Sequence, residues 1–121
     1  MKMMSISDLK LEEHYGKYKD KPFFKHLKRF MQSAPVIALV LEGVEAVSAV
    51  RLIAGVTKGR AADAGTIRGD LSMSMQTNVV HVSDPNENVD EEIYRFFNED
   101  ELFAYEKIDI EYLYSPDELE G

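Results

Sequence analysis

The stretch PVIALVLEG, residues 35–43, decides the fold of this 121-residue chain. Its apolar residues form a continuous run that is rich in β-branched side chains, and Pro35 and Gly43 bound it. A run of this kind, with no alternation of polar residues, is typical of a strand that is buried on both faces. The segments on either side of it carry helical periods instead.

Two helices are predicted on the N-terminal side of this strand. Ser7 or Asp8 can cap the first of them, which carries Leu11, His14, Tyr15 and Tyr18. Pro22 suits the first position of the second helix. The apolar residues of this second helix share one face, namely Phe23, Leu27, Phe30 and Met31. Residues 3–6 precede both helices and are expected to form a strand or the end of one.

A helix, a loop, a strand and another helix are predicted on the C-terminal side. The first helix begins at about Val44, has Gly55 just past its end, and turns five residues inward: Ala46, Val47, Val50, Ile53 and Ala54. Residues 56–76 form a long irregular connection, and residues 78–82 form a short strand. Asp84, Pro85 and Glu87 then cap a helix whose core face is Val89, Ile93, Phe96 and Phe97. This order predicts an α+β sandwich with helices on one face of a small sheet.

The composition fits one globular domain, with 45% hydrophobic and 30% charged residues. The chain contains no Cys, which excludes disulfide scaffolds, thiol catalysis and thiolate metal sites. Its longest apolar run is far shorter than the roughly 20 residues that span a bilayer, and its start lacks the pattern of a signal peptide. We therefore expect a soluble, cytoplasmic protein without a membrane partner.

The formal net charge of −8 belongs to the C-terminal end. From Asn98 onward, Lys107 is the only basic residue beside nine acidic ones: Glu99, Asp100, Glu101, Glu106, Asp109, Glu111, Asp117, Glu118 and Glu120. Residues 1–97 carry thirteen charges of each sign and sum to zero. The overall charge therefore does not exclude an anionic ligand on the body of the protein.

Three histidines are candidates for chemistry. His26 lies beside lysines on the predicted second helix and is expected on its solvated face. His14 either lines a site or is partly buried. His81 interrupts the predicted strand just before a helix N-terminus, where unpaired N–H groups attract anions. A structural role in the core is the alternative for a histidine inside a strand.

His81 has neighbours that suit a nucleophile or a general base. Ser83 and Glu92 can hydrogen-bond its imidazole and fix the tautomer. Arg68 lies between glycines in GTIRGD, residues 65–70, where a guanidinium can bind phosphate oxygens. Further cations are Arg51, Lys58 and Arg60, for which a plain surface position is the alternative. No glycine-rich phosphate loop is present, and no spacing of His, Asp and Glu predicts a metal site.

These motifs together resemble the nucleoside diphosphate kinase family. The similar features occur in the same order and spacing: HYGKYKDKPFF at residues 14–24, PVIALVLEG, the pair Arg51 and Thr57, GTIRGD, and NVVHVSD at residues 78–84. The resemblance runs from about Met3 to Tyr105, which is nearly the whole chain. The combination of GTIRGD with NVVHVSD is highly specific.

The resemblance implies an enzyme with a ping-pong mechanism. His81 would take the γ-phosphoryl of ATP or another nucleoside triphosphate and pass it to a nucleoside diphosphate. Tyr15, Ser83 and Glu92 would support the histidine. The nucleotide would bind to Phe23 through its base, to Asn78 through its ribose, and to Arg51, Thr57 and Arg68 through its phosphates. Mg²⁺ would travel on those phosphates, with no metal ligands from the protein.

The resemblance also implies a ferredoxin-like α+β sandwich with a small antiparallel sheet, assembled into homo-oligomers, either hexamers or tetramers. Nucleic acid is not expected as a partner. We expect a kinase-like domain at residues 1–105 and an acidic tail at residues 106–121. The first strand of the family, with its Lys-Pro-Asp motif, and the helix after it have no counterpart here, and Met1 falls inside what would be the second strand.

Three smaller departures from the family pattern concern the site. Val82 stands where a Gly is usual, Lys58 and Gly59 stand where Asn-Pro is usual, and Thr77 stands where an Arg is common. The missing strand and helix motivate an alternative function, a truncated, weakly active or inactive module that binds nucleotide or oligomerises, and these smaller departures agree with lower activity. A ligand-sensing domain with a structural His81 is a third hypothesis.

Overall fold

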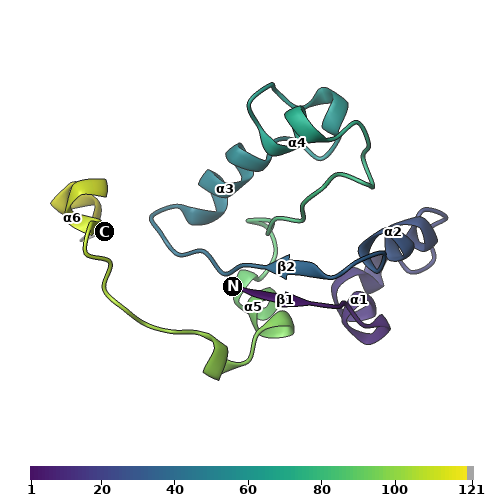
Figure 1. The fold of residues 1–121 in the computed structure, drawn as a ribbon, viewed down its shortest axis with the longest axis horizontal. Helices are drawn as coiled ribbons and strands as arrows, with labels where there is room; N and C mark the ends of the chain where they lie inside the picture. Colours follow the sequence, from purple (N-terminus) through teal and green to yellow (C-terminus); the bar gives the residue numbers. More distant parts are fainter. Residues whose placement is uncertain (120–121) are drawn as a thin grey trace.

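The central strand is shorter than its apolar run. In the computed structural model, which describes residues 1–119, β2 spans Val36–Ala38 and pairs antiparallel with β1, Lys2–Met4. Met3 lies opposite Ile37 in the register of this two-stranded sheet (Figure 1). Both strands therefore belong to an antiparallel sheet, as the α+β prediction requires.

The prediction that this strand is buried on both faces is wrong. Ile37 is 59% exposed and its neighbour Met3 is 70% exposed, so one face of the sheet is open in the part of the chain that the structure describes. The other face lies against Phe97, whose ring is 4.8 Å from the Lys2 ammonium. An apolar run shows that both faces of a strand lack polar residues, but it does not show which face is covered by a neighbouring element.

Both predicted N-terminal helices form, but Tyr18 lies beyond the end of the first and Pro22 lies before the start of the second, so the positions predicted for these two residues are wrong. Helix α1 spans Asp8–Tyr15, is followed by a 3-10 turn at Gly16–Tyr18, and has Ser7 as its cap, with the hydroxyl accepting from the Lys10 amide. Helix α2 spans Phe24–Met31 and begins two residues after Pro22. Leu11 is 1% exposed and is the most completely buried large side chain of the described residues. Helix α1 packs against α5, and this contact positions the site.

The next helix is shorter and more exposed than expected. Helix α3 spans Ala46–Ala54 and begins after Glu45, whose φ of 49° lies in the left-handed region. The inward position predicted for Ile53 is wrong, because its side chain is 60% exposed. Gly55 ends the helix at φ 83°, which confirms its role just past the C-terminus.

The irregular connection contains short helical pieces. A 3-10 turn spans Gly59–Ala61, and α4 spans Ile67–Leu71, beginning within the GTIRGD motif and ending one residue after it. Thr66 caps α4, since its hydroxyl accepts from the Gly69 amide. A Cβ at Gly69 would lie 1.9 Å from the Asp63 carbonyl oxygen, so this close approach of two backbone segments requires glycine.

The predicted strand at residues 78–82 is absent, and a tight turn replaces it. Val79 has φ 75°, and the Val80 amide donates to the Asn78 carbonyl two residues earlier. The carbonyls of Asn78 and Val80 also accept hydrogen bonds from the Arg68 side chain. A side chain thus occupies carbonyls that a neighbouring strand would otherwise use.

The helix after His81 begins later than predicted. Helix α5 spans Val89–Phe96, and its cap is Asn88, whose side chain accepts from the Glu91 amide. The predicted cap, Asp84, instead accepts from the Asn86 amide in a turn before the helix. Both residues are good caps, and the turn at residues 84–86 delays the start of the helix.

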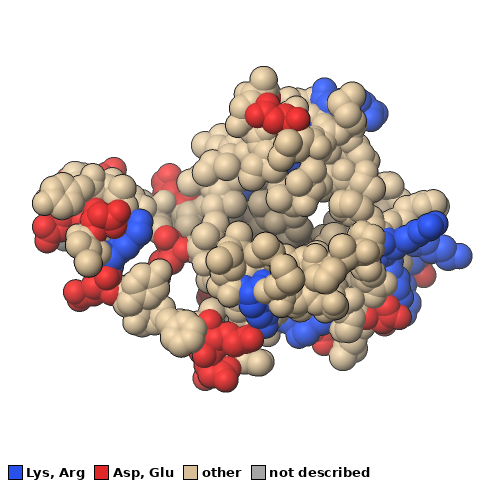
Figure 2. Space-filling view, in the orientation of Figure 1, with Lys and Arg blue, Asp and Glu red and all other residues tan. Residues whose placement is uncertain are grey.

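The last described residues extend away from the body. After the 3-10 turn at Glu99–Glu101, the chain leads to α6, Ile110–Leu113, and α7, Pro116–Leu119, at one side of the molecule (Figure 1). Figure 2 shows acidic side chains gathered on this extension and basic ones over α2. The predicted tail of residues 106–121 includes two residues, Glu120 and Gly121, that lie outside the described part.

Among the described helices, none combines the length and the apolar character that crossing a membrane requires.

Candidate active site

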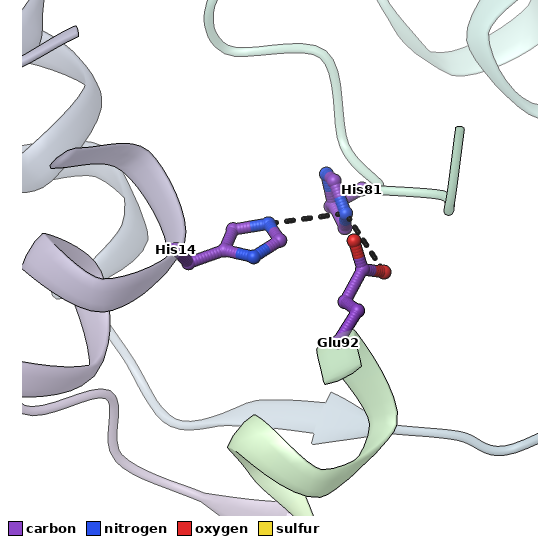
Figure 3. Close-up of side chains that lie close together, drawn as sticks. All are labelled: His14, His81 and Glu92. Atoms are coloured by element: carbon purple, nitrogen blue, oxygen red, sulfur yellow. Dashed lines mark hydrogen bonds and ion pairs between the residues drawn. The ribbon is translucent and has the colours of Figure 1, made fainter. Parts of the chain in front are cut away.

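Three segments of the chain meet at His81. The loop 78–83 provides the histidine, α1 provides His14 and Tyr15, and α5 provides Glu92 (Figure 3). The Nε2 atom of His81 lies 3.1 Å from His14 Nε2 and 3.3 Å from Glu92 Oε1. Its Nδ1 atom lies 3.3 Å from the Tyr15 hydroxyl. Both ring nitrogens therefore have polar neighbours, and the side chain is still 35% exposed to solvent.

Glu92 is the ionised anchor of the site. Its carboxylate accepts a 2.6 Å hydrogen bond from the Ser83 hydroxyl through the same oxygen that faces His81. The interaction with the His81 ring, and then the bond from Ser83, lower the pKa of Glu92 to about 2, although burial acts in the opposite direction. Ser83 therefore holds the carboxylate and does not bond the imidazole itself, which differs from the predicted direct contact.

His14 is a member of the site through a contact that sequence patterns do not reveal. Its Nδ1 lies 2.9 Å from Arg95 Nη1 on α5. A guanidinium only donates, so Nδ1 accepts, and the neutral His14 ring carries its proton on Nε2, toward His81. Burial, and then the charge of His81, lower the pKa of His14 to about 4. The packing of α1 against α5 creates this pair, because 81 residues separate the two side chains along the chain.

Tyr15 lies on the other side of the His81 ring. The ring centroids of these two residues are 5.9 Å apart and the planes are nearly perpendicular. Burial raises the pKa of Tyr15 to about 12, so its hydroxyl keeps its proton at neutral pH. The hydroxyl can donate to Nδ1 or accept from it. It can therefore hold the His81 ring in place whether or not Nδ1 carries a proton.

Arg68 is buried under the loop that carries His81. Its guanidinium donates to three backbone carbonyls, those of Gly55, Asn78 and Val80, at 2.9, 3.4 and 2.6 Å. The side chain is 6% exposed, and burial lowers its pKa. Three of its five N–H groups are therefore occupied by the backbone. The structure gives Arg68 a role in shaping the loop, and phosphate binding by its remaining donors stays a prediction.

Arg51, Thr57 and Asn78 line the same loop. Arg51 Nη1 donates to the Ser83 carbonyl at 3.2 Å, which ties α3 to the segment after the histidine. The Asn78 amide donates to the Thr57 carbonyl at 2.9 Å. These contacts bring the predicted phosphate and ribose residues close to one another through the backbone, and the Thr57 side chain faces solvent.

Phe23 lies at the end of an aromatic row that leads to the histidine. Its ring centroid is 5.7 Å from that of Tyr18, which is 6.5 Å from that of Tyr15. Phe23 directly precedes α2 and is half-buried. His26 on α2 is exposed, as predicted, and takes no part in this row.

Metal-binding atoms also come together here, which the sequence did not predict. One ligand atom each from His14, His81 and Glu92 lies within 4.8 Å of the other two (Figure 3). Sequence spacing gives no sign of this group, because its members come from α1, a loop and α5.

The family model for nucleoside diphosphate kinase matches residues 1–102. A nucleoside diphosphate kinase of Parabacteroides distasonis is 50% identical over 119 residues, covering 98% of this chain and 78% of the relative. One of Methanobrevibacter smithii is 43% identical, covering 94% of this chain and 76% of the relative.

Solved structures agree with the sequence comparison and with the ferredoxin-like α+β prediction. A halophilic nucleoside diphosphate kinase from Halobacterium salinarum, solved in complex with CDP, superposes with a TM-score of 0.89 at 38% identity, covering 93% of this chain and 76% of that one. A nucleoside diphosphate kinase family protein from Babesia bovis superposes with a TM-score of 0.86 at 34% identity, with the same coverage. The chain therefore belongs to the nucleoside diphosphate kinase family of enzymes.

Proposed function

We propose that this chain is a nucleoside diphosphate kinase that transfers the γ-phosphoryl group of ATP through His81. The observation that carries the proposal is an exposed imidazole held on both ring nitrogens, by Tyr15 on one side and by His14 and Glu92 on the other. Such a ring is fixed in orientation while its side chain stays 35% exposed to solvent. A nucleophile in phosphoryl transfer needs this combination of positioning and access.

The reaction divides into two half-reactions at His81. In the first, a ring nitrogen forms a bond to the γ-phosphorus, the bond from that phosphorus to the β,γ-bridging oxygen breaks, and the nucleoside diphosphate leaves. In the second, a terminal oxygen of another nucleoside diphosphate forms a bond to the same phosphorus and the P–N bond breaks. The ionised Glu92 carboxylate stabilises the positive charge that the ring gains in the first step.

The remaining predicted residues would bind the nucleotide. Phe23 offers a ring face for any base, and Asn78 and Thr57 lie beside the loop that would hold the ribose and phosphates. Arg51 and Arg68 place two guanidinium groups next to the His81 segment. Mg²⁺ is proposed to enter with the nucleotide phosphates, since oxygen-preferring Mg²⁺ is usually held by substrate phosphates and few carboxylates.

Labelling with γ-³²P-ATP and Mg²⁺ tests the proposal. The wild-type chain is expected to gain acid-labile, alkali-stable phosphate, as a phosphohistidine does, and to pass it to an added nucleoside diphosphate. His81→Ala should gain no label. The matched control is His26→Ala, because His26 is an exposed histidine on α2 outside the site. Label that persists in His81→Ala would refute the proposal.

The same assay separates the alternative function. A weakly active or inactive module that only binds nucleotide would bind ADP in a calorimeter but would show no exchange of phosphate between ATP and a second diphosphate. Val82, in place of the usual glycine, motivates this alternative, because its side chain adds bulk next to the histidine. Exchange at a rate of at least about 1 per second, within the usual range for kinases, would exclude it.

Assembly and location are proposals as well. We propose a homo-oligomer, a hexamer or a tetramer, because large apolar side chains of the open sheet face and of the C-terminal extension are exposed in the single chain. Light scattering after gel filtration gives the mass of the assembly directly. A monomer at micromolar concentration would refute the proposed homo-oligomer. A cytoplasmic location is proposed on the absence of Cys, which suits a reducing compartment.

A further inference from the structure

The group formed by His14, His81 and Glu92 has the dimensions of a metal site. Two pairs of its ligand atoms are in near contact, with His14 Nε2 to His81 Nε2 at 3.1 Å and His81 Nε2 to Glu92 Oε1 at 3.3 Å. All three atoms lie within 4.8 Å of one another. Figure 3 shows that His14 and Glu92 both lie against the His81 ring, and that the three side chains come from three segments.

These separations match one coordination geometry. Zn²⁺ binds imidazole nitrogen and carboxylate oxygen at about 2.0–2.2 Å, so neighbouring ligands of a tetrahedral ion are about 3.3–3.5 Å apart. Two of the three separations are therefore already within a few tenths of an ångström of the tetrahedral value. The third, between the ligand atoms of His14 and Glu92, is at most 4.8 Å and would have to shorten on binding. Two imidazoles with one carboxylate, and a fourth position open to water, are also a ligand set that Zn²⁺ uses.

We propose that His14, His81 and Glu92 form a binding site for one tetrahedral transition-metal ion of the Zn²⁺ class. This site is distinct from the Mg²⁺ that the nucleotide would carry, because Mg²⁺ prefers oxygen ligands in octahedral geometry. The ion would reach it from solvent, since the His81 side chain is 35% exposed.

Two neighbouring side chains already hold the ligands as metal sites require. The Ser83 hydroxyl donates to Glu92 at 2.6 Å and orients the carboxylate. The Tyr15 hydroxyl lies 3.3 Å from His81 Nδ1 and can accept its proton when Nε2 binds metal. Outer partners of this kind fix the tautomer of a ligating imidazole.

Arg95 opposes metal binding, and it gives the proposal its sharpest test. Its guanidinium donates to His14 Nδ1, which keeps the His14 proton on Nε2, the atom that would bind the ion. Binding therefore requires this proton to move to Nδ1 and Arg95 to swing away. A glutamine at position 95 can instead accept a hydrogen bond from Nδ1–H and removes one positive charge. Arg95→Gln should accordingly bind the metal more tightly than the wild type.

Calorimetric titration of the unphosphorylated full chain with ZnCl₂ tests the site. We expect one Zn²⁺ per chain, with an affinity that saturating Mg²⁺ leaves unchanged. His14→Ala should weaken binding by about tenfold or more, and Arg95→Gln should tighten it several-fold. His26→Ala is the matched control and should bind like the wild type. Should His14→Ala unfold by circular dichroism, Glu92→Gln takes its place.

Co²⁺ provides a second measurement, because a tetrahedral Co²⁺ site gives intense visible absorption and an octahedral surface site does not. Equal Zn²⁺ affinity in wild type and His14→Ala, or an octahedral Co²⁺ spectrum, would overturn the proposal. The ligand assignment does not depend on catalysis, so failure of zinc binding with normal phosphate labelling refutes the metal site alone. Normal zinc binding with no labelling refutes the proposed function alone.

One consequence does depend on the proposed function. A metal ion on His81 Nε2 occupies the only free electron pair of the neutral ring, because Nδ1 then carries the proton, so no ring nitrogen is left to attack the γ-phosphorus. Zn²⁺ should therefore suppress phosphate labelling in the presence of Mg²⁺, and His14→Ala should be less sensitive when each variant is compared with its own rate without zinc. Equal sensitivity of the two chains would refute this consequence.

Discussion

The surroundings of His81 and the C-terminal extension are built in opposite ways. Around His81, buried polar groups hold the structure: Arg68 gathers three carbonyls, and Ser83 bonds the buried Glu92. In the extension, residues 103–119, large apolar side chains face solvent, and the Ile108 side chain is 98% exposed. Specific hydrogen bonds between buried groups are thus concentrated around His81, whereas the extension exposes apolar surface that can contact other molecules.

The charge distribution follows the same division. Acidic residues gather on the extension (Figure 2). The His81 surroundings contain Arg51, Arg68 and Arg95, with the carboxylates of Glu92 and Glu87 also close to the histidine pair. A field that would repel nucleotide phosphates is therefore kept away from the histidine. Because the His81 surroundings are held by buried polar contacts and the extension is exposed, substitutions in these two regions should differ strongly in their effect on the free energy of unfolding.

The largest effect is expected at Arg68. Arg68→Met leaves the carbonyls of Gly55, Asn78 and Val80 without their donor, and should lower the free energy of unfolding by about 3–5 kcal/mol. Urea denaturation measures it. The matched control is Arg60→Met, because Arg60 is exposed and donates to a single carbonyl, with an expected loss below about 1 kcal/mol. Similar losses in both variants would remove the distinction between buried and exposed guanidinium groups.

The second effect is a pH dependence that His14 introduces. Its pKa is lowered to about 4 in the folded chain from an ordinary 6.5, so between these values the unfolded chain binds more protons. Stability should therefore fall as the pH falls from 6.5 toward 4, by about 3 kcal/mol in total. Urea denaturation at several pH values measures the slope.

His14→Gln should flatten this slope above pH 4.5. Glu92 contributes a separate loss only at lower pH, because its pKa is lowered from 4.5 to about 2 and protons bind the unfolded carboxyl first. An unchanged slope between pH 6.5 and 4.5 in His14→Gln would contradict the assignment of a buried neutral ring.

The third effect concerns the start of α5. Asn88→Ala removes the cap of this helix and should cost about 1 kcal/mol in the free energy of unfolding. Asp84→Ala removes only a turn contact to Asn86 and should cost less. Thermal denaturation of the pair compares them. A larger loss of stability for Asp84→Ala than for Asn88→Ala would show that Asp84 caps α5, as the sequence predicted.

The smallest effect is expected in the extension. Ile108→Ser should change the free energy of unfolding of the dilute chain by less than about 0.5 kcal/mol, since the side chain contacts little in the single chain. Gel filtration of the same variant at high concentration tests whether Ile108 contributes to assembly. A loss of 1 kcal/mol or more at low concentration would show that Ile108 itself packs on the body.

Local signals predicted the helices better than the sheet. Ser7 and the period of α1 act within a few residues, so that helix formed where expected. The run at residues 35–43 yields only three strand residues, because strand length depends on the partner, and β1 supplies three. The strand predicted at residues 78–82 is replaced by a turn, since Arg68 takes its carbonyls.

The candidate site was predictable only in part for the same reason. His81, Ser83 and Glu92 lie within eleven residues of one another, so helical geometry and the motif indicated their association. His14 and Arg95 meet through the packing of α1 on α5, and no local pattern encodes that contact. The grouping of His14, His81 and Glu92 has no local sequence signal, because it depends on the same packing.

The turn at Val79 has a consequence for the evolution and engineering of this chain. A β-branched residue at φ 75° is strained by about 1–3 kcal/mol, and the Arg68 bonds on either side of it hold that strain in place. Val79→Gly would relax the backbone and so gain stability, but it would also loosen the loop that aims the imidazole. At position 79, selection for thermal stability would thus favour glycine, whereas selection for turnover would favour valine.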